Sequence, residues 1–205
     1  MKAPRPPATL EFDPSRDVVS YADPLWRIFT ARGPHAQVWD EARLFGSLRG
    51  MRFDPHPSPL GTHSRGVLYA AASISTAFAE VFQADRVIAR DQNRAVASWI
   101  PTRPLELLDL AGSFPVRNGA SFAMTVGPKR FTQEWAHAID EQLGERIDGV
   151  SYRSAITGTS AFVLFTRAWS TPSFPPTAGF HRTLDDPLLR DLLATVATEL
   201  NFGIR

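Results

Sequence analysis

The chain has 205 residues, of which 43% are hydrophobic and 21% are charged, values typical of one ordinary globular domain. Its formal net charge of +1 argues against direct nucleic-acid binding, which needs a concentrated basic patch, and zero cysteines exclude disulfides and thiolate-bound zinc. It has neither an apolar run of about eighteen residues nor an N-terminal signal stretch, so we expect a cytoplasmic location and no membrane contact.

The N-terminal part of the chain gives the weakest pattern. Residues 1–22 contain four prolines and little apolar periodicity, so we expect an extended or disordered arm ahead of a domain over 23–205. Leu25–Phe29 is a predicted strand. The apolar spacing in Val38–Leu48 predicts a helix, and the prolines and glycines of 54–66 predict a loop.

The middle of the chain begins with a predicted strand, turn and helix. The strand covers Val67–Ala70, and Ser73 or Ser75 offers an N-cap for a helix that runs through Gln83. The later elements are predicted strands at Ala95–Ile100, Leu105–Leu110, Val150–Tyr152 and Ala161–Thr166, a helix at Thr132–Leu143, and a C-terminal helix opened by Asp186-Pro187. This order lacks regular strand–helix–strand alternation, so it predicts a single α+β domain with short helices around a mixed or antiparallel sheet.

The most informative residue is Glu80, because its predicted helix is otherwise apolar from Ala77 to Phe82. Carboxylates are rarely buried without a partner or a role. Glu80 is either a site residue or a partly exposed residue paired with an arginine such as Arg86. Tyr69 is either a site residue or a core ring with a wet hydroxyl.

The sequence lacks the common motifs of metal sites, of nucleophilic serines and of phosphate-binding loops. Its histidines show no HExxH or paired ligand spacing, so no metal site is expected. No GxSxG nucleophile elbow, GxGxxG loop or GxxxxGK[ST] loop is present. The basic residues are twenty arginines and the lysines Lys2 and Lys129. This bias reflects either a GC-rich genome or a few arginines kept for bidentate contact with phosphate.

Four segments together resemble the RES domain family, which is named for its Arg, Glu and Ser. They are Leu25-Trp26-Arg27-Ile28, Arg52-Phe53-Asp54, Leu68-Tyr69-Ala70-Ala71 with Ser73, Thr76, Ala77 and Glu80, and Gly149–Ser154 followed by Phe162–Phe165. Two positions depart from the family pattern: Met51 stands where glycine is usual, and Arg153 where proline is common. Ser160 is an alternative to Ser154 for the serine.

The resemblance implies a fold like that of ADP-ribosyltransferases and an enzyme that cleaves the nicotinamide–ribose bond of NAD. It implies catalytic roles for Arg52, Tyr69, Glu80 and Ser154, and substrate binding by Arg27, Tyr152 and Ser73. NAD would be the substrate, with no resident cofactor, and water or inorganic phosphate would be the acceptor. The expected partner is a protein antitoxin. Whether the chain also forms a homo-oligomer is left open. The alternatives are an ADP-ribosyltransferase acting on a macromolecule and a non-catalytic partner-binding module.

The residue types suit this chemistry. Cleavage expels neutral nicotinamide and leaves an oxocarbenium-like ribose, so it gains from a nearby negative charge, a flat surface for the ring and donors for the pyrophosphate. Glu80, Tyr69 and Arg52 meet these needs in that order.

Overall fold

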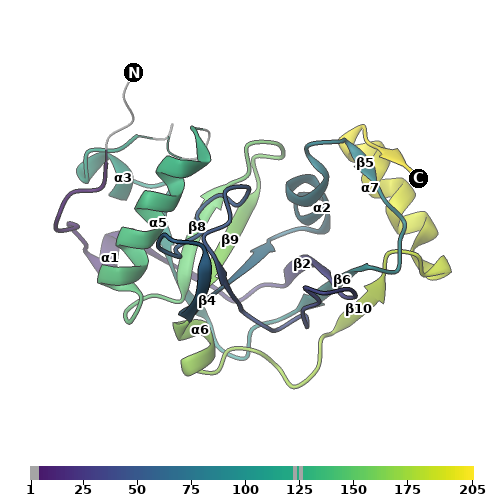
Figure 1. Ribbon diagram of the computed structural model, residues 1–205, viewed down its shortest axis with the longest axis horizontal. Coiled ribbons are helices and arrows are strands. Elements are labelled where there is room, and N and C mark those ends of the chain that lie inside the picture. Colours follow the sequence, from purple (N-terminus) through teal and green to yellow (C-terminus); the bar gives the residue numbers. More distant parts are fainter. Residues whose placement is uncertain (1–4, 122–123, 125–126) are drawn as a thin grey trace.

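In the part of the chain that the computed structural model describes, residues 5–121, 124 and 127–205, a mixed sheet of nine strands forms the centre (Figure 1). Its strands are β1 (Val18–Tyr21), β2 (Leu25–Thr30), β3 (Arg43–Gly46), β4 (Gly61–Ala71), β6 (Arg94–Trp99), β7 (Leu105–Asp109), β8 (Gly149–Arg153), β9 (Ser160–Phe165) and β10 (Phe180–Thr183). The spatial order is β1-β7-β8-β9-β4-β2-β6-β10, and β3 pairs with β4 beside this path. β7 and β8 pair in parallel.

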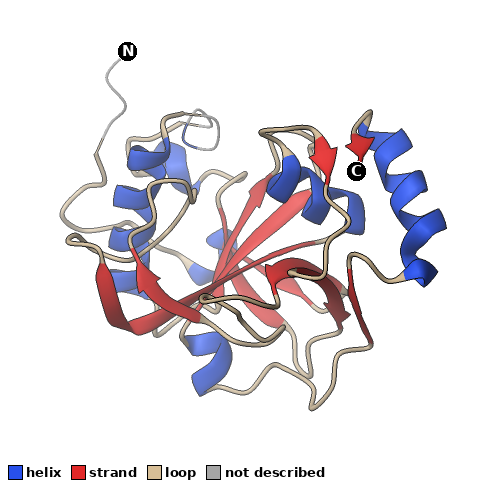
Figure 2. Cartoon of the chain, turned by 45° about the vertical axis from the view of Figure 1, so that its right-hand side comes forward, coloured by secondary structure: helices blue, strands red, loops and turns tan. Residues whose placement is uncertain are grey.

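Short helices and a small second sheet surround these strands. The helices are α1 (Pro14–Asp17), α2 (Ile74–Phe82), α3 (Phe114–Arg117), α5 (Lys129–Leu143), α6 (Arg167–Ser170) and α7 (Arg190–Leu200), and a 3-10 turn at Pro187–Leu189 precedes α7. The second sheet pairs β5 (Val87–Ile88) with β11 (Gly203–Ile204) in parallel. Figure 2 shows helices on both sides of the strands, with the C-terminal helix α7 beyond α2. None of the helices described is both long and apolar enough to cross a membrane.

Alternation along β9 explains how one sheet supports two cores. Val163 and Phe165 pack with α5 residues such as Trp135, while Phe162 and Leu164 pack on the opposite face. Successive side chains of a strand point to opposite faces, so a strand apolar at every position must be covered twice. A third cluster joins α2 to α7. The predicted α+β domain with a mixed sheet is confirmed.

The N-terminal prediction needs correction. Residues 1–4 lie outside the described residues, but Leu10 is buried, and β1 pairs with β7 from Val18 to Tyr21. The predicted arm over 1–22 is therefore in part an edge of the sheet. Because its few apolar residues lie against a strand almost ninety residues later, local periodicity did not reveal it.

The predicted helix at Val38–Leu48 is wrong. Trp39 is buried against Trp99, whereas Leu44 and Phe45 are exposed and β3 pairs with β4. The three- and four-residue spacing there is a coincidence, because these apolar side chains do not share one buried face. The strand that was predicted at Val67–Ala70 also extends back to Gly61, into the predicted loop.

A buried carboxylate organises the loop between β3 and β4. Asp54 is fully buried and accepts from Arg43 at 2.9 Å, from the Leu48 N–H at 2.8 Å, and from both the backbone N–H and Nδ1 of His56 at 3.1 and 2.7 Å. The other ring nitrogen of His56 lies 2.9 Å from the carbonyl oxygen of Arg65. Gly46 is required here, because a Cβ would lie 2.2 Å from the His56 ring.

The pKa of Asp54 follows from these contacts. Burial alone raises it, but the bonds from His56, from Leu48 and from the cation Arg43 more than offset this, so the pKa lies below the usual 3.8. Because the folded pKa is the lower one, the carboxylate stabilises the fold above about pH 4, and that stabilisation is lost as the pH falls through the folded pKa.

The first prediction concerns the neighbouring leucines of the C-terminal turn, since Leu189 is 2% exposed and Leu188 is 77% exposed. We expect Leu189→Ala to lower the free energy of unfolding by about 2–5 kcal/mol, because it empties part of the α2–α7 core. Leu188→Ala should change it by no more than about 0.5 kcal/mol. Urea denaturation measures both, and equal effects would contradict the burial of this segment.

The second prediction tests the buried carboxylate. Asp54→Asn should lower the free energy of unfolding at pH 7 by about 3 kcal/mol, the scale for breaking a buried ion pair. The difference from wild type should shrink at pH 3, because below the usual pKa of 3.8 the carboxyl of the unfolded wild-type chain binds protons. Asp85→Asn, at an exposed aspartate, is the control. A deficit that is the same at both pH values would contradict the ionised state of Asp54.

Candidate functional site

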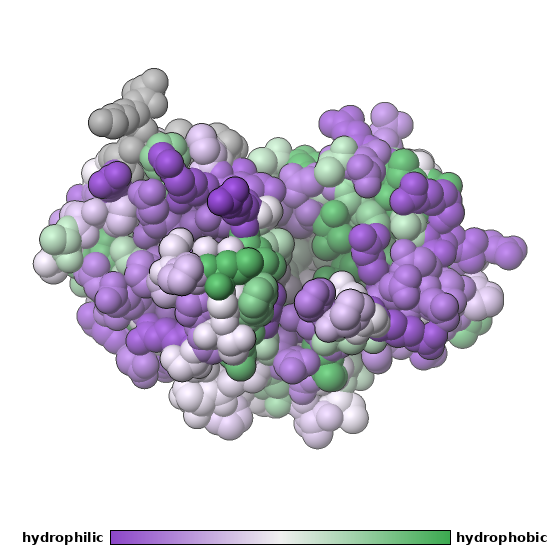
Figure 3. All heavy atoms as spheres, viewed as in Figure 1, coloured by the Kyte–Doolittle hydropathy of each residue, from purple (hydrophilic) through white to green (hydrophobic). Residues whose placement is uncertain are grey.

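A pocket of about 130 Å³ opens where β2, β4, α2 and the start of α5 come together. Its charged and aromatic lining residues are Trp26, Arg27, Arg52, Tyr69, Glu80, Lys129 and Tyr152. Figure 3 shows the surface hollowed between the side that carries α5 and the side that carries α2. Residues separated by more than one hundred positions in the chain therefore share one cavity.

The strand, turn and helix from β4 to α2 supply one wall of this pocket. The Ser73 Oγ accepts the Thr76 N–H at 3.1 Å, which caps the first turn of α2. Ala77 and Glu80 line the pocket, while Phe78 packs on the core side. An amphipathic helix thus turns its one carboxylate to the cavity.

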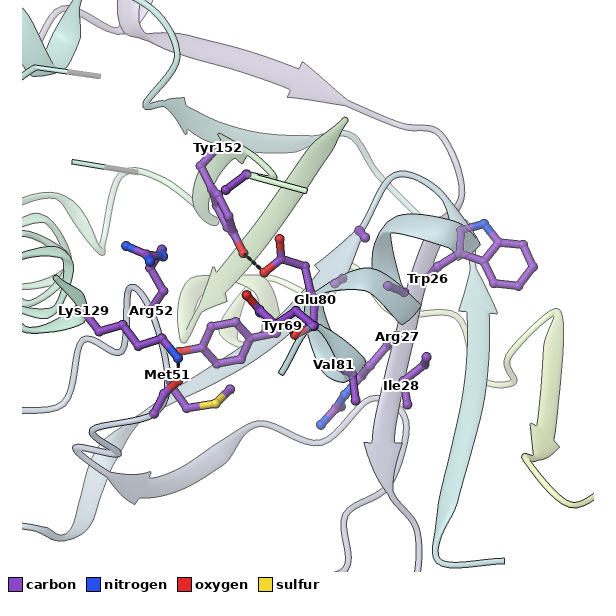
Figure 4. Close-up of a pocket in the computed structure, with 16 residues that line it drawn as sticks. Trp26, Arg27, Ile28, Met51, Arg52, Tyr69, Glu80, Val81, Lys129 and Tyr152 are labelled. Atoms are coloured by element: carbon purple, nitrogen blue, oxygen red, sulfur yellow. Dashed lines mark hydrogen bonds between the residues drawn. The ribbon is translucent and has the colours of Figure 1, made fainter. Parts of the chain in front are cut away.

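Glu80 is partly exposed and is the carboxylate of the pocket (Figure 4). Its Oε2 accepts a long hydrogen bond, 3.5 Å, from the hydroxyl of Tyr152. Burial raises the pKa of Tyr152, and the charge of Glu80 raises it further, so the phenol stays protonated and donates. Glu80 is partly exposed, as the alternative expects, but among the described residues no salt bridge joins it to Arg86.

Tyr69 stands on β4 beside Glu80 and Tyr152 in the pocket lining (Figure 4). Burial raises its pKa well above the usual value, the charge of Asp54 adds to this, and Arg43 opposes it. Within the described residues its hydroxyl oxygen is buried without a hydrogen bond of normal geometry. The ring is therefore a neutral, flat surface in the pocket lining.

Two cations line the opposite part of the pocket. Arg52 donates from NH1 to the carbonyl of Gly127 at 2.7 Å, and Lys129 donates from Nζ to the carbonyl of Gly50 at 2.6 Å. Figure 4 shows both on one side, with Glu80 nearer the middle. The residue after Arg52, Phe53, has a left-handed φ of 57° and is held by burial against the Tyr152 ring.

The structure directs the guanidinium of Arg27 to a loop, and substrate binding by Arg27 stays a prediction. Although Arg27 is in the pocket lining, its NH1 donates to the carbonyls of Val38, Trp39 and Glu41, and its NH2 donates to the Gln37 side chain. Burial lowers its pKa to about 9, so it stays charged at neutral pH. Figure 4 shows the side chain leading away from Glu80. Its guanidinium holds the loop that precedes β3.

The two serines also lie apart from the pocket lining. Ser73 is the cap of α2, and the Ser154 Oγ accepts from the N–H groups of Ile156 and Thr157 at 3.3 and 3.4 Å. Thr157 in turn hydrogen-bonds Thr76 at 2.9 Å, so the turn after β8 supports the start of α2. Ser160, the alternative, accepts from Arg153 at 3.3 Å.

The structure therefore brings together Arg52, Tyr69, Glu80 and Tyr152, and it adds Lys129, which sequence reasoning missed as a site residue. One clue was available, since Lys129 is one of two lysines among 22 basic residues. In the described part of the chain, no three His, Asp or Glu side chains are grouped so that they could hold a metal ion.

Comparisons with known proteins bear on the family and the fold. The family model of the RES domain matches residues 24–185. A chain of the crystal structure of the M. tuberculosis MbcT–MbcA toxin–antitoxin complex has a similar fold, with a TM-score of 0.54 and 18% identity over 88% of this chain and 93% of that chain. No curated protein is significantly similar in sequence. Since the family model covers most of the chain, including the strand, turn and helix that carry Tyr69 and Glu80, this protein belongs to the RES domain family.

Proposed function

We propose that this protein cleaves the nicotinamide–ribose bond of NAD. The observation that carries the proposal is the separation of charge in one pocket: Glu80 with its Tyr152 donor lies on one part, and Arg52 with Lys129 on another. NAD has the complementary arrangement, because its nicotinamide is cationic and its pyrophosphate is anionic. Glu80 and Arg52 are also residues for which the family resemblance implies a role.

The proposed chemistry needs few groups. As the bond between C1′ and the nicotinamide nitrogen breaks, both electrons leave with the ring, which becomes neutral, and positive charge develops on the ribose. The Glu80 carboxylate stabilises that charge, and Tyr152 holds the carboxylate in place through its hydroxyl. The acceptor oxygen then bonds to C1′, and water as acceptor releases one proton. Tyr69 offers a flat face for a ring of the substrate.

We further propose that the protein is the toxin of a toxin–antitoxin pair and that a protein antitoxin restrains it. Membership of the RES domain family and the similar fold of a chain from a toxin–antitoxin complex support this proposal. Loss of NAD stops metabolism generally, so an unrestrained enzyme would harm its own cell.

A direct assay tests the activity. Purified protein is incubated with NAD, with and without inorganic phosphate, and free nicotinamide and the ribose product are followed. Release in both conditions indicates water as acceptor, and release that requires phosphate indicates phosphorolysis. Release that requires an added protein or nucleic acid would favour an ADP-ribosyltransferase, and no release in any condition would contradict the proposal.

The third prediction is that Glu80→Gln lowers kcat for NAD cleavage by about two to three powers of ten, the scale of one preorganised electrostatic contact. The amide keeps the size of the side chain and an oxygen that accepts from Tyr152, so the melting temperature should change little. Glu145→Gln is the control, because that side chain is 89% exposed. Normal turnover in a well-folded Glu80→Gln protein would refute the role of the carboxylate.

The fourth prediction concerns growth. Bacteria that express the wild type without a partner should lose intracellular NAD and stop growing, whereas bacteria that express Glu80→Gln at the same level should grow. Equal growth of the two strains with unchanged NAD would remove the toxin proposal and favour a partner-binding module.

A further inference from the structure

Two reciprocal contacts join the loop before β4 to the start of α5. Arg52, from the loop, donates to Gly127 at 2.7 Å, and Lys129, from the helix, donates to Gly50 at 2.6 Å. Each of the two contacts uses one N–H group of the Arg52 guanidinium or of the Lys129 ammonium. An ammonium group and a guanidinium group both have further N–H donors, and no hydrogen bond among the described residues uses these donors. The carbonyls thus orient the two cations without saturating them.

Neither Arg52 nor Lys129 forms a salt bridge with a carboxylate among the residues that the structure describes. By contrast, Arg43, Arg103 and Arg117 each form a salt bridge with a buried aspartate. Two uncompensated positive charges in one cavity repel each other, and an anion between them would remove that repulsion. The pocket therefore has a part that favours negative charge.

Lys129 is also unfavourable for its own helix. It is the first residue of α5, which has no acidic residue in its first turn and no side-chain cap. A positive charge at a helix N-terminus opposes the helix dipole. Residues that destabilise their own helix are expected at functional sites, where a different interaction offsets the lost helix stability.

We infer that Lys129 is a substrate-binding residue that, together with Arg52, grips the pyrophosphate of NAD and makes the site selective for a dinucleotide. This inference rests on the proposed function and adds a residue for which the family resemblance implied no role. The arginine supplies a planar fork and the lysine a compact charge, so two adjacent phosphate groups find two different cations. The nicotinamide end then lies towards Glu80.

The fifth prediction tests Lys129 alone. Lys129→Gln removes the charge but keeps an amide that can donate to Gly50, so the loop contact is preserved. We expect KM for NAD to rise about tenfold, the scale of one charge-assisted hydrogen bond, with kcat within about twofold of wild type. The inhibition constant of ADP-ribose, which carries the same pyrophosphate, should rise by a similar factor. Lys129→Arg should restore much of both.

Arg130→Gln is the matched control, because Arg130 is the next residue, is 78% exposed and lies near Glu134. It should leave KM and the inhibition constant unchanged. Unchanged constants in Lys129→Gln would overturn the inference, as would a fall in kcat accompanied by a lower melting temperature, which would indicate a structural role. Wild-type protein that releases no nicotinamide would instead refute the proposed function, so the two failures are distinguishable.

Discussion

The pocket depends on one buried carboxylate. Asp54 ties together Arg43 on β3, the N–H of Leu48 and the ring of His56, and these contacts fix both ends of the loop that presents Arg52. A buried charge is stable only when its partners are in place, so the loop has little freedom to take another path. The left-handed Phe53 lies between Arg52 and Asp54, and the same network compensates its strain.

The rest of the site is built around this fixed loop. β4 is paired with β9 and β2, so Tyr69 sits on a rigid strand, and the core formed with α7 anchors α2 behind Glu80. Ser75 on α2 also donates to Glu199 on α7 at 2.5 Å. The C-terminal helix lies beyond residues 24–185, the part matched by the family model. In this chain, therefore, a segment outside that match supports the helix that carries the carboxylate.

Sequence patterns predicted those parts of the fold that are determined by interactions between residues close together in the chain. The strand, turn and helix from β4 to α2 follow from a serine cap and an apolar run, and the pocket does contain Arg52, Tyr69, Glu80 and Tyr152. Positions fixed by distant contacts were not predictable in this way. Arg27 binds loop carbonyls, Ser154 closes a turn, and Lys129 meets Gly50 across 79 positions. No spacing rule covers such a pair, because tertiary packing alone brings it together.

In the proposed function, charge is sorted within one pocket, so that Glu80 faces the ribose of NAD and the two cations face its pyrophosphate. A crystal structure of the Glu80→Gln protein soaked with NAD tests this most directly. We expect intact NAD with its nicotinamide ribose beside residue 80, its pyrophosphate between Arg52 and Lys129, and an aromatic ring of NAD or its ribose against Tyr69. NAD bound in the reverse direction, or at another place on the protein, would contradict it.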